Sequence, residues 1–273
     1  MMSEPEWRRL NRANWDERVA IHIAPASDYE TDLLRQGNYA LHAIEENELG
    51  PVAGRLLLHL QCHFGIDTLA LAQKGAVVTG LDFSEPAIAA ARDLAAEIGI
   101  DATFVQSDIY EARAAVVGEF ERVFTSWGTI YWLPDIRAWA KVVASLLASG
   151  GEFYFADIHP AALIFDDDIA GIDGMPGWFS PYFQQGALVR DDARDYANPA
   201  ARLANTRTHQ FMHPVANVVQ ALLDAGLQLT MLHEHDTLAW KQFACMVETE
   251  GRLYRLPDQA WLPLSYSLKA IKP

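Results

Sequence analysis

The residues best suited to chemistry stand at the ends of two short apolar runs. The first run leads into the turn HLQCHFG at 59–65, and the second ends at Asp82. Asp82 follows Gly65 by 17 positions, close to the spacing at which a carboxylate holds the vicinal ribose hydroxyls of a bound nucleotide. The alternative is an acid that only stabilises the start of the following helix. Because strand, turn, spacing and helix cap agree, the pattern favours ribose binding.

The turn at 59–65 departs from the glycine-rich pattern of dinucleotide-binding proteins. Such a turn needs glycines so that the backbone can approach a pyrophosphate, but here Gln61 and His63 occupy two of the expected positions. This argues against NAD and FAD and favours a ligand without phosphate; the alternative is a core turn that binds nothing. We expect Gly65, the one retained glycine, where backbone and ligand approach closely.

These turns need a scaffold that brings strand ends together. From residue 55 onward, short apolar runs alternate with helical patterns. The predicted strands are 55–60, 76–83, 102–108, 120–127 and 152–159. The predicted helices are 64–75, 84–99, 109–117 and 135–151, the second capped by Ser84 and the last stopped by glycines. Five such repeats predict a doubly wound parallel sheet, in which ligands bind beyond the carboxyl ends of the strands.

The flanking segments suggest one large domain with additions. Residues 1–50 are predicted to form a helical cap segment, and 51–273 the main domain. The stretch 160–213 is rich in Asp, Pro, Gly and aromatic residues, and we interpret it as an irregular lid or substrate-binding insertion. The remaining predicted elements are helices at 6–19, 29–49 and 213–226 and strands at 227–235 and 262–271.

The stretch LLLHLQCHFGIDTLALAQKGAVVTGLDFSEPAIAAAR resembles motifs I and II of class I S-adenosylmethionine (SAM)-dependent methyltransferases, and especially a bacterial subgroup with an LQCHFG variant of motif I. The resemblance covers residues 50–160 well and the rest loosely. His59 takes the place of the family's acidic residue, and Gln61 and His63 replace two of its three glycines. The resemblance implies an α/β, Rossmann-like, seven-stranded, mostly parallel sheet with helices on both faces and the last strand antiparallel.

The same resemblance implies SAM as cofactor and assigns residues to it. Asp108 would accept a hydrogen bond from the adenine amine, although a helix N-cap is the alternative, and Ile109 would pack on the ring. Trp127 would lie beside the sulfonium, with a core tryptophan as the alternative. The implied cofactor-binding residues are His59, Gln61, His63, Gly65, Asp82, Phe83, Asp108, Ile109, Ser126 and Trp127.

His159 and Tyr131 are the candidate catalytic residues. His159 follows the fifth strand and titrates near neutrality, which suits a general base, but it could equally hydrogen-bond backbone in the turn before Pro160. Tyr131 could assist an oxygen acceptor.

His209 and His213, spaced i, i+4, could face one another on a helix, but they lack a zinc-binding partner motif. His233 and His235 would share one face of a predicted strand beside Glu234 and Asp236, where an exposed strand end is favoured over a metal site. No metal site is predicted.

The composition of the chain favours some substrate classes and cellular locations over others. A net charge of −15 disfavours nucleic acid, and two cysteines with no apolar leader or membrane-spanning run predict a cytoplasmic protein. The function expected is methyl transfer from SAM to a small molecule. A non-catalytic SAM-binding protein and, less favoured, an NAD-linked oxidoreductase are the alternatives. The methyl acceptor and the oligomeric state stay open.

Overall fold

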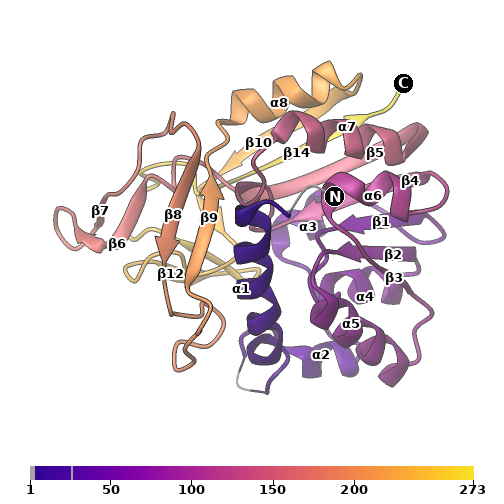
Figure 1. Ribbon diagram of the computed structural model, residues 1–273, viewed down its shortest axis with the longest axis horizontal. Coiled ribbons are helices and arrows are strands. Elements are labelled where there is room, and N and C mark those ends of the chain that lie inside the picture. The colour runs from indigo at the N-terminus through magenta and orange to yellow at the C-terminus, as the bar shows by residue number, and fades with distance from the viewer. Residues whose placement is uncertain (1–3, 26) are drawn as a thin grey trace.

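The computed structural model describes residues 4–25 and 27–273. A seven-stranded sheet forms its centre, with the strand order β10-β14-β5-β4-β1-β2-β3 (Figure 1). Its strands are β1 Leu56–Leu60, β2 Val77–Asp82, β3 Thr103–Gln106, β4 Phe120–Ser126, β5 Leu147–Ile158, β10 Gln228–His235 and β14 Ser265–Ile271. Strands β1 to β5 pair in parallel, and β14 runs antiparallel to both of its neighbours. The predicted fold class is confirmed, including the antiparallel last strand.

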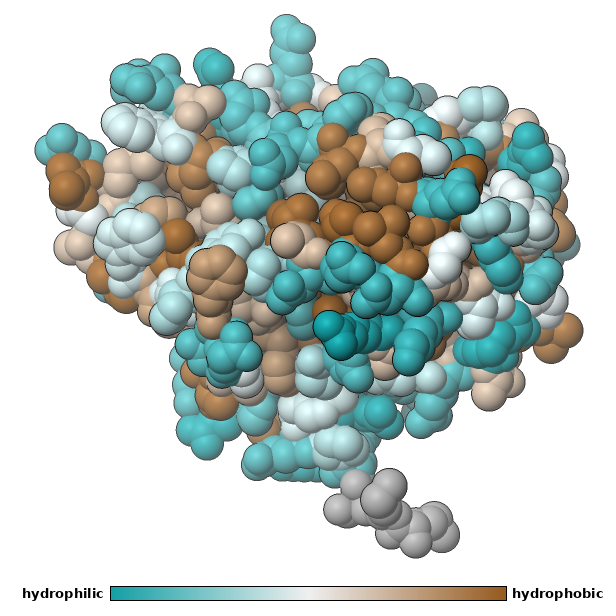
Figure 2. Space-filling view, turned by 90° about the horizontal axis from the view of Figure 1, so that it is seen from above, coloured by the Kyte–Doolittle hydropathy of each residue, from teal (hydrophilic) through white to brown (hydrophobic). Residues whose placement is uncertain are grey.

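Helices cover both faces of the sheet. The helices are α1 Glu6–His22, α2 Thr31–Arg35, α3 Ala43–Glu48, α4 Ile66–Gln73, α5 Glu85–Glu97, α6 Ala112–Ala115, α7 Ile136–Leu146 and α8 Val215–Asp224. One apolar core joins α6, α7 and α8 to the sheet, and a second joins α2, α4 and α5 to the opposite face. Figure 2 looks onto the face with α7 and α8, where apolar side chains gather in the middle of a hydrophilic surround. Within the described residues, no helix is long and apolar enough to cross a membrane.

Local sequence signals account for the element boundaries near the site. Helix α5 begins as predicted at Ser84, whose Oγ accepts a hydrogen bond from the Ala87 amide. The helix predicted at 135–151 is wrong at its end, because α7 stops at Leu146 and Leu147 already pairs with Phe120 of β4. Gly150, with a φ of +76°, lies where the register between β4 and β5 shifts, so the glycines serve a strand irregularity rather than a helix stop.

The predicted helix at 29–49 is also wrong, because the chain forms two short helices, α2 and α3, separated by residues 36–42. Residues 160–213 are not irregular throughout. They contain two hairpins, built from β6 Phe165–Ala170 with β7 Pro176–Trp178 and from β8 Ala187–Asp191 with β9 Arg207–Phe211. A small three-stranded sheet, β11 Thr237–Leu238, β12 Val247–Thr249 and β13 Leu253–Arg255, was not predicted. Figure 1 shows α1 between the β8–β9 hairpin and the central sheet.

Candidate functional site

The carboxyl ends of β1, β2, β3, β4 and β5 meet at one edge of the sheet, and the predicted site residues lie there. The turn after β1 has an unusual backbone. Gln61 and His63 have φ values of +56° and +51°, in the left-handed region that glycine adopts most easily. This chain therefore keeps a glycine-type turn while projecting two polar side chains from it.

Each of these side chains has a distinct environment. The Gln61 amide nitrogen donates to the Thr129 carbonyl at 3.1 Å, whereas its Oε1 is buried with no hydrogen-bond partner among the described residues. His59 is buried beneath the turn, with Nδ1 2.8 Å from the Thr68 hydroxyl. Burial lowers the pKa of His59 to about 3, so this ring is neutral. It serves the core as a small polar group and carries none of the charge of the family's acidic residue.

Gly65 stands at a position where the core and the backbone conformation both favour glycine. A Cβ atom there would lie 2.7 Å from the Phe104 ring and 3.0 Å from the Ala91 Cβ. Its φ of +77° also disfavours any other residue. The protein's own core, between α5 and β3, therefore approaches Gly65 closely, and the expected approach of a ligand at this position stays a prediction.

Asp82 is buried at the end of β2, with only 6% of its surface exposed. Its two carboxylate oxygens accept hydrogen bonds from the amides of His63 and Ser84, each at 2.9 Å. Burial raises the pKa of Asp82 to about 6, against the effect of these amides. The neighbouring Phe83 is half-buried. Each oxygen of a carboxylate can accept more than one hydrogen bond, so Asp82 retains the capacity to bind hydroxyl groups.

Asp108, at the end of β3, is engaged on both oxygens. Oδ1 accepts from the Tyr110 amide at 2.9 Å, and Oδ2 lies 3.0 Å from Arg8 Nε of α1. It therefore caps the short 3₁₀ helix η1, Ile109–Glu111, as the alternative interpretation proposed, and also anchors α1. Ile109 is buried beside it.

The end of β4 carries Ser126 and Trp127. Ser126 is buried, and Trp127 has a φ of +48°. The Trp127 indole nitrogen donates to Glu45 Oε1 of α3, while Glu45 Oε2 is buried with no hydrogen-bond partner among the described residues. Burial raises the pKa of Glu45 well above its usual value. Trp132, in the 3₁₀ helix η2, Ile130–Trp132, likewise has a buried indole nitrogen without a partner in this part of the chain.

A buried chain of polar contacts, not predicted from the sequence, ties three segments together. His63 Nε2 lies 2.8 Å from His22 Nδ1 of α1, and His22 Nε2 lies 3.0 Å from Asp195 Oδ2 in the insertion. Arg18 pairs with the same carboxylate at 2.7 Å. Burial would raise the pKa of Asp195, but the hydrogen bond from His22 and the positive charge of Arg18 lower it instead. The carboxylate can only accept, so His22 carries its proton on Nε2 and accepts from His63 through Nδ1.

The two candidate catalytic residues differ in access. His159 is buried, its Nδ1 accepts from the Ala161 amide at 3.0 Å, and its Nε2 lies 3.1 Å from Glu234. With both ring nitrogens engaged, this geometry favours the turn-stabilising alternative over a general base. Tyr131 lines two adjoining cavities beyond the ends of β4 and β5.

The weaker histidine candidates lie in two different settings. His209 lies on β9, and His213 lies beyond its end with Nε2 2.7 Å from the Leu133 carbonyl, so the possibility that they face one another on a helix is corrected. His233 is paired with Glu48 at 2.8 Å. Within residues 4–25 and 27–273, no group of three or more His, Cys, Asp or Glu side chains is placed to hold a metal ion.

Comparison with known proteins agrees with this geometry. Residues 57–151 match the family model described as a methyltransferase domain. The chain is 32% identical over 126 residues to the ubiquinone biosynthesis O-methyltransferase of Cronobacter sakazakii, a match that covers 44% of this chain and 51% of the relative. The chain therefore spans about half the length of the curated relatives it matches.

Solved structures share the fold over most of the chain. An S-adenosylmethionine-dependent methyltransferase from Mesorhizobium loti has a TM-score of 0.59 and 20% identity, with 84% of this chain and 96% of that one covered. The glycopeptide N-methyltransferase MtfA complexed with S-adenosylmethionine has a TM-score of 0.54 and 16% identity, with coverage of 93% and 96%. These likenesses extend the shared architecture beyond the segment matched by the family model.

Proposed function

We propose that this chain is a SAM-dependent methyltransferase that acts on a small molecule. The observation that carries the proposal is the buried carboxylate of Asp82, which lies at the end of β2 and is held against the turn after β1 by the His63 amide. The methyltransferase-domain match over 57–151 and the fold of the solved relatives support it. The finer assignment, to the bacterial subgroup with LQCHFG in motif I, is part of the same proposal.

The donors and acceptors at the strand ends fit SAM. Asp82 would hold the ribose hydroxyls, and Asp108 with Ile109 would face the adenine once Arg8 gives way. Gln61 Oε1 and Trp132 Nε1, which have no partner among residues 4–25 and 27–273, suit an amino group and a carboxylate respectively, which the methionine end carries. The other proposed contacts in this site are His59, His63, Gly65, Phe83, Ser126 and Trp127.

When bound, SAM supplies an electrophilic methyl group on a sulfonium. The chain's own residues contribute position and exclusion of water, which are major sources of rate in such a displacement. Helix α1 covers the strand ends through Arg8 and Trp15, the latter packed 5.3 Å from the His63 ring. Tyr131, in the lining of both cavities, is the residue we assign to contact the acceptor, and His159 holds the turn after β5.

Two alternatives from other classes remain as competitors. A non-catalytic SAM-binding protein would have the same cofactor site, and an NAD-linked oxidoreductase would need room for a pyrophosphate where Gln61 and His63 now stand. An acidic net charge of −15 supports a small-molecule acceptor over nucleic acid, and two free cysteines support a cytoplasmic location.

The test combines binding with turnover. The protein is titrated with SAM by calorimetry and then incubated with methyl-labelled SAM and a metabolite extract, with Asp82→Asn as the matched variant. SAM binding together with a labelled small product, both weakened in the variant, supports the proposal. Binding without any labelled product favours the non-catalytic alternative, and binding of NAD but not SAM refutes the proposal.

A further inference from the structure

Helix α1 contacts two of the strand ends at which we place SAM. Arg8 Nε of this helix lies 3.0 Å from Asp108 Oδ2. Further along the helix, Asp16 Oδ1 accepts a hydrogen bond at 2.6 Å from the hydroxyl of Ser84, two residues beyond Asp82. Asp108 is the carboxylate proposed to face the adenine, so α1 and the cofactor compete for it. The free protein therefore withholds part of its own cofactor site.

The contact between Arg8 and Asp108 is of a kind that a ligand can replace. The two side chains are 21% and 10% exposed, so the pair is largely shielded from water. Even so, Arg8 Nε makes no hydrogen bond among the described residues, because its N–H is not aligned with the nearby carboxylate oxygen. A buried N–H without an acceptor costs free energy, which release of the side chain into water recovers. Exchange of Arg8 for the adenine amine thus loses a charge contact but relieves a buried donor.

The same helix is bound to the insertion by a row of polar contacts. Side chains of α1 bond to backbone groups of residues 204–209 and to the Asp195 carboxylate. Asn11, for example, bonds the His209 backbone in both directions, at 2.9 and 2.8 Å. All of the α1 side chains in this row except Glu17 are buried. The row consists of Asn11, Asn14, Glu17, Arg18 and His22.

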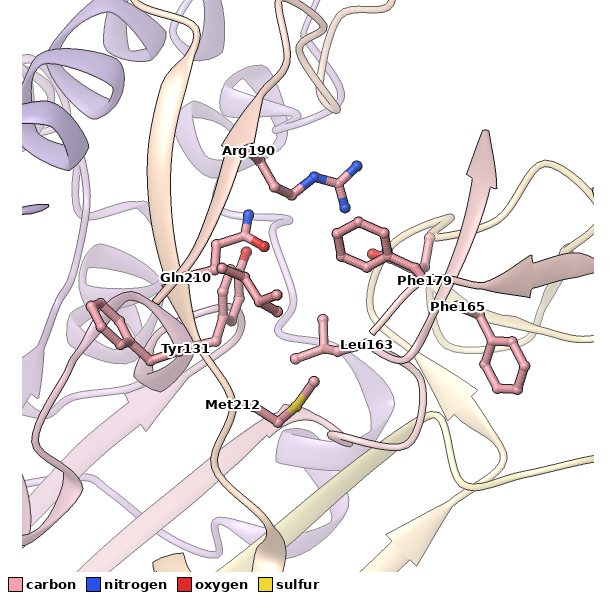
Figure 3. A pocket seen from close by; sticks show the side chains of 10 residues that line it. Tyr131, Leu163, Phe165, Phe179, Arg190, Gln210 and Met212 are labelled. Atoms are coloured by element: carbon pink, nitrogen blue, oxygen red, sulfur yellow. The ribbon is translucent and has the colours of Figure 1, made fainter. Parts of the chain in front are cut away.

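We call α1 and residues 187–211, which include the β8–β9 hairpin, the cover; Figure 1 shows the hairpin alongside α1. Packing is less complete where the hairpin meets the rest of the chain. A cavity with room for about one water molecule lies there, and Figure 3 shows Arg190 and Gln210 of the hairpin beside Tyr131 at this seam. Buried polar bonds hold the parts of the cover together, whereas its seam with the domain contains a void. The cover is therefore built to move as one body.

We infer that the cover inhibits its own cofactor site: Arg8 holds the adenine-binding carboxylate in the free protein, and SAM displaces Arg8 and shifts α1 together with the hairpin. This inference rests on the proposed function for the role of Asp108. The measured SAM affinity is then the affinity of the open site, reduced by the fraction of molecules in which Arg8 has left Asp108. Removal of Arg8 should raise that affinity, which is the opposite of what loss of a cofactor contact would do.

The first experiment measures SAM and adenosine binding by calorimetry. Arg8→Ala should bind both ligands about three- to fivefold more tightly, the most that a partly exposed ion pair typically opposes. Adenosine has no charge, so its gain cannot come from a general attraction of the acidic protein for the SAM cation. Arg12→Ala is the matched control, because it removes the same charge one turn along α1, where the arginine pairs with Glu4 at 2.8 Å. Its affinities should change less than about twofold.

The outcomes of this experiment separate the inference from the proposed function. Unchanged or weaker binding in Arg8→Ala, or an equal gain in Arg12→Ala, would overturn the inference while SAM binding by the wild type leaves the proposed function standing. A wild-type protein that binds no SAM would remove the proposed function and this inference with it. Circular dichroism and thermal unfolding check that both variants fold.

The second experiment tests whether the cover moves as one body. Spin labels on cysteines introduced into Cys245→Ser protein report distances by pulsed electron paramagnetic resonance. The exposed label sites are Arg9 of α1, Val189 of β8 and Asp93 of α5, and each labelled protein must bind SAM as the wild type does. SAM should lengthen the 9–93 distance and leave the 9–189 distance unchanged. An unchanged 9–93 distance, or a 9–189 distance that changes as much, would overturn the inference.

Discussion

The two halves of the proposed site differ in how they handle charge. On the cofactor side, under α1, which we call the charged half, buried or half-buried acidic groups are fixed by amides, arginines and a histidine, as at Asp82, Asp108 and Asp195. In the larger of the two cavities that Tyr131 lines, which we call the acceptor half, Arg190 carries a charge, and Asp166 neutralises it. The ring of Trp132 lies 4.6 Å from that of Tyr131, which puts a Tyr–Trp pair between the halves.

This difference shows how one site can serve two unlike ligands. A charged ligand needs fixed charges and donors, whose burial is tolerable only when each is paired. An apolar ligand needs a wall that offers shape and few donors. Because α1 pairs with the sheet through Arg8 and with the insertion through Arg18, the charged half also connects the added segments to the domain.

The largest effect is expected at Asp195, where the charged half is most deeply buried. Asp195→Ala would leave the Arg18 guanidinium buried without its carboxylate, which should lower the free energy of unfolding by about 3–5 kcal/mol. Asp191→Ala is the matched control: Asp191 pairs with Arg207 on the surface, so its loss should leave stability nearly unchanged. Urea unfolding measures both. Equal stability of the two variants would mean that burial does not strengthen the Asp195 contacts.

The next largest effect is expected on SAM affinity, which a substitution in the charged half should weaken and one in the acceptor half should not. Asp82→Ala should weaken SAM by about 2–3 kcal/mol, because a doubly accepting carboxylate is lost. Asp166→Ala, in the acceptor half, should change SAM affinity by less than about twofold, because Asp166 is not among the proposed cofactor contacts. Calorimetric titration of SAM tests both variants, with thermal unfolding as a check on folding. A comparable loss in Asp166→Ala would show that the halves are not independent.

Lowering the pH should reduce the free energy of unfolding more through His59, on the cofactor side, than through His159. The folded pKa of His59 is about 3, against an ordinary value of 6.5, so the unfolded chain takes up a proton that the folded one refuses. This contribution is complete above pH 6.5 and is lost as the pH falls toward 3, at up to about 1.4 kcal/mol per pH unit. Burial also lowers the pKa of His159, but Glu234 opposes the shift. His59→Gln should therefore flatten the pH dependence of unfolding more than His159→Gln; the reverse order would contradict these environments.

The smallest effect is expected on turnover from the acceptor half. Tyr131→Phe should lower kcat about tenfold, equivalent to about 1.4 kcal/mol, with SAM affinity unchanged, because one contact to the acceptor is lost. His159→Gln should change kcat less than about threefold if its ring only holds the turn. Steady-state kinetics with an acceptor identified by the labelled-extract experiment provides the measurement. A loss of about a hundredfold in His159→Gln would restore His159 as the general base.

Sequence reasoning succeeded where the signal was local. The strands at 55–60 and 76–83 and the cap at Ser84 follow from apolar runs and a side chain that bonds a nearby amide. It failed at 147–151, where pairing with β4 overrides two glycines that resemble a helix stop. The β6–β7 hairpin within 160–213 escaped prediction because Asp, Gly and Pro interrupt the alternation that marks strands.

The sequence by itself therefore determined the sheet and the placement of Asp82 and Asp108 at its strand ends, because periodicity and caps act over a few residues. Only the tertiary structure decided which distant groups share a buried site. His22 meets His63 across 41 residues and Asp195 across 173, and nothing in the local pattern of any of them records the contact. Such contacts form because polar groups buried by the packing of α1 and the insertion must find partners, and the fold as a whole determines which partners are near.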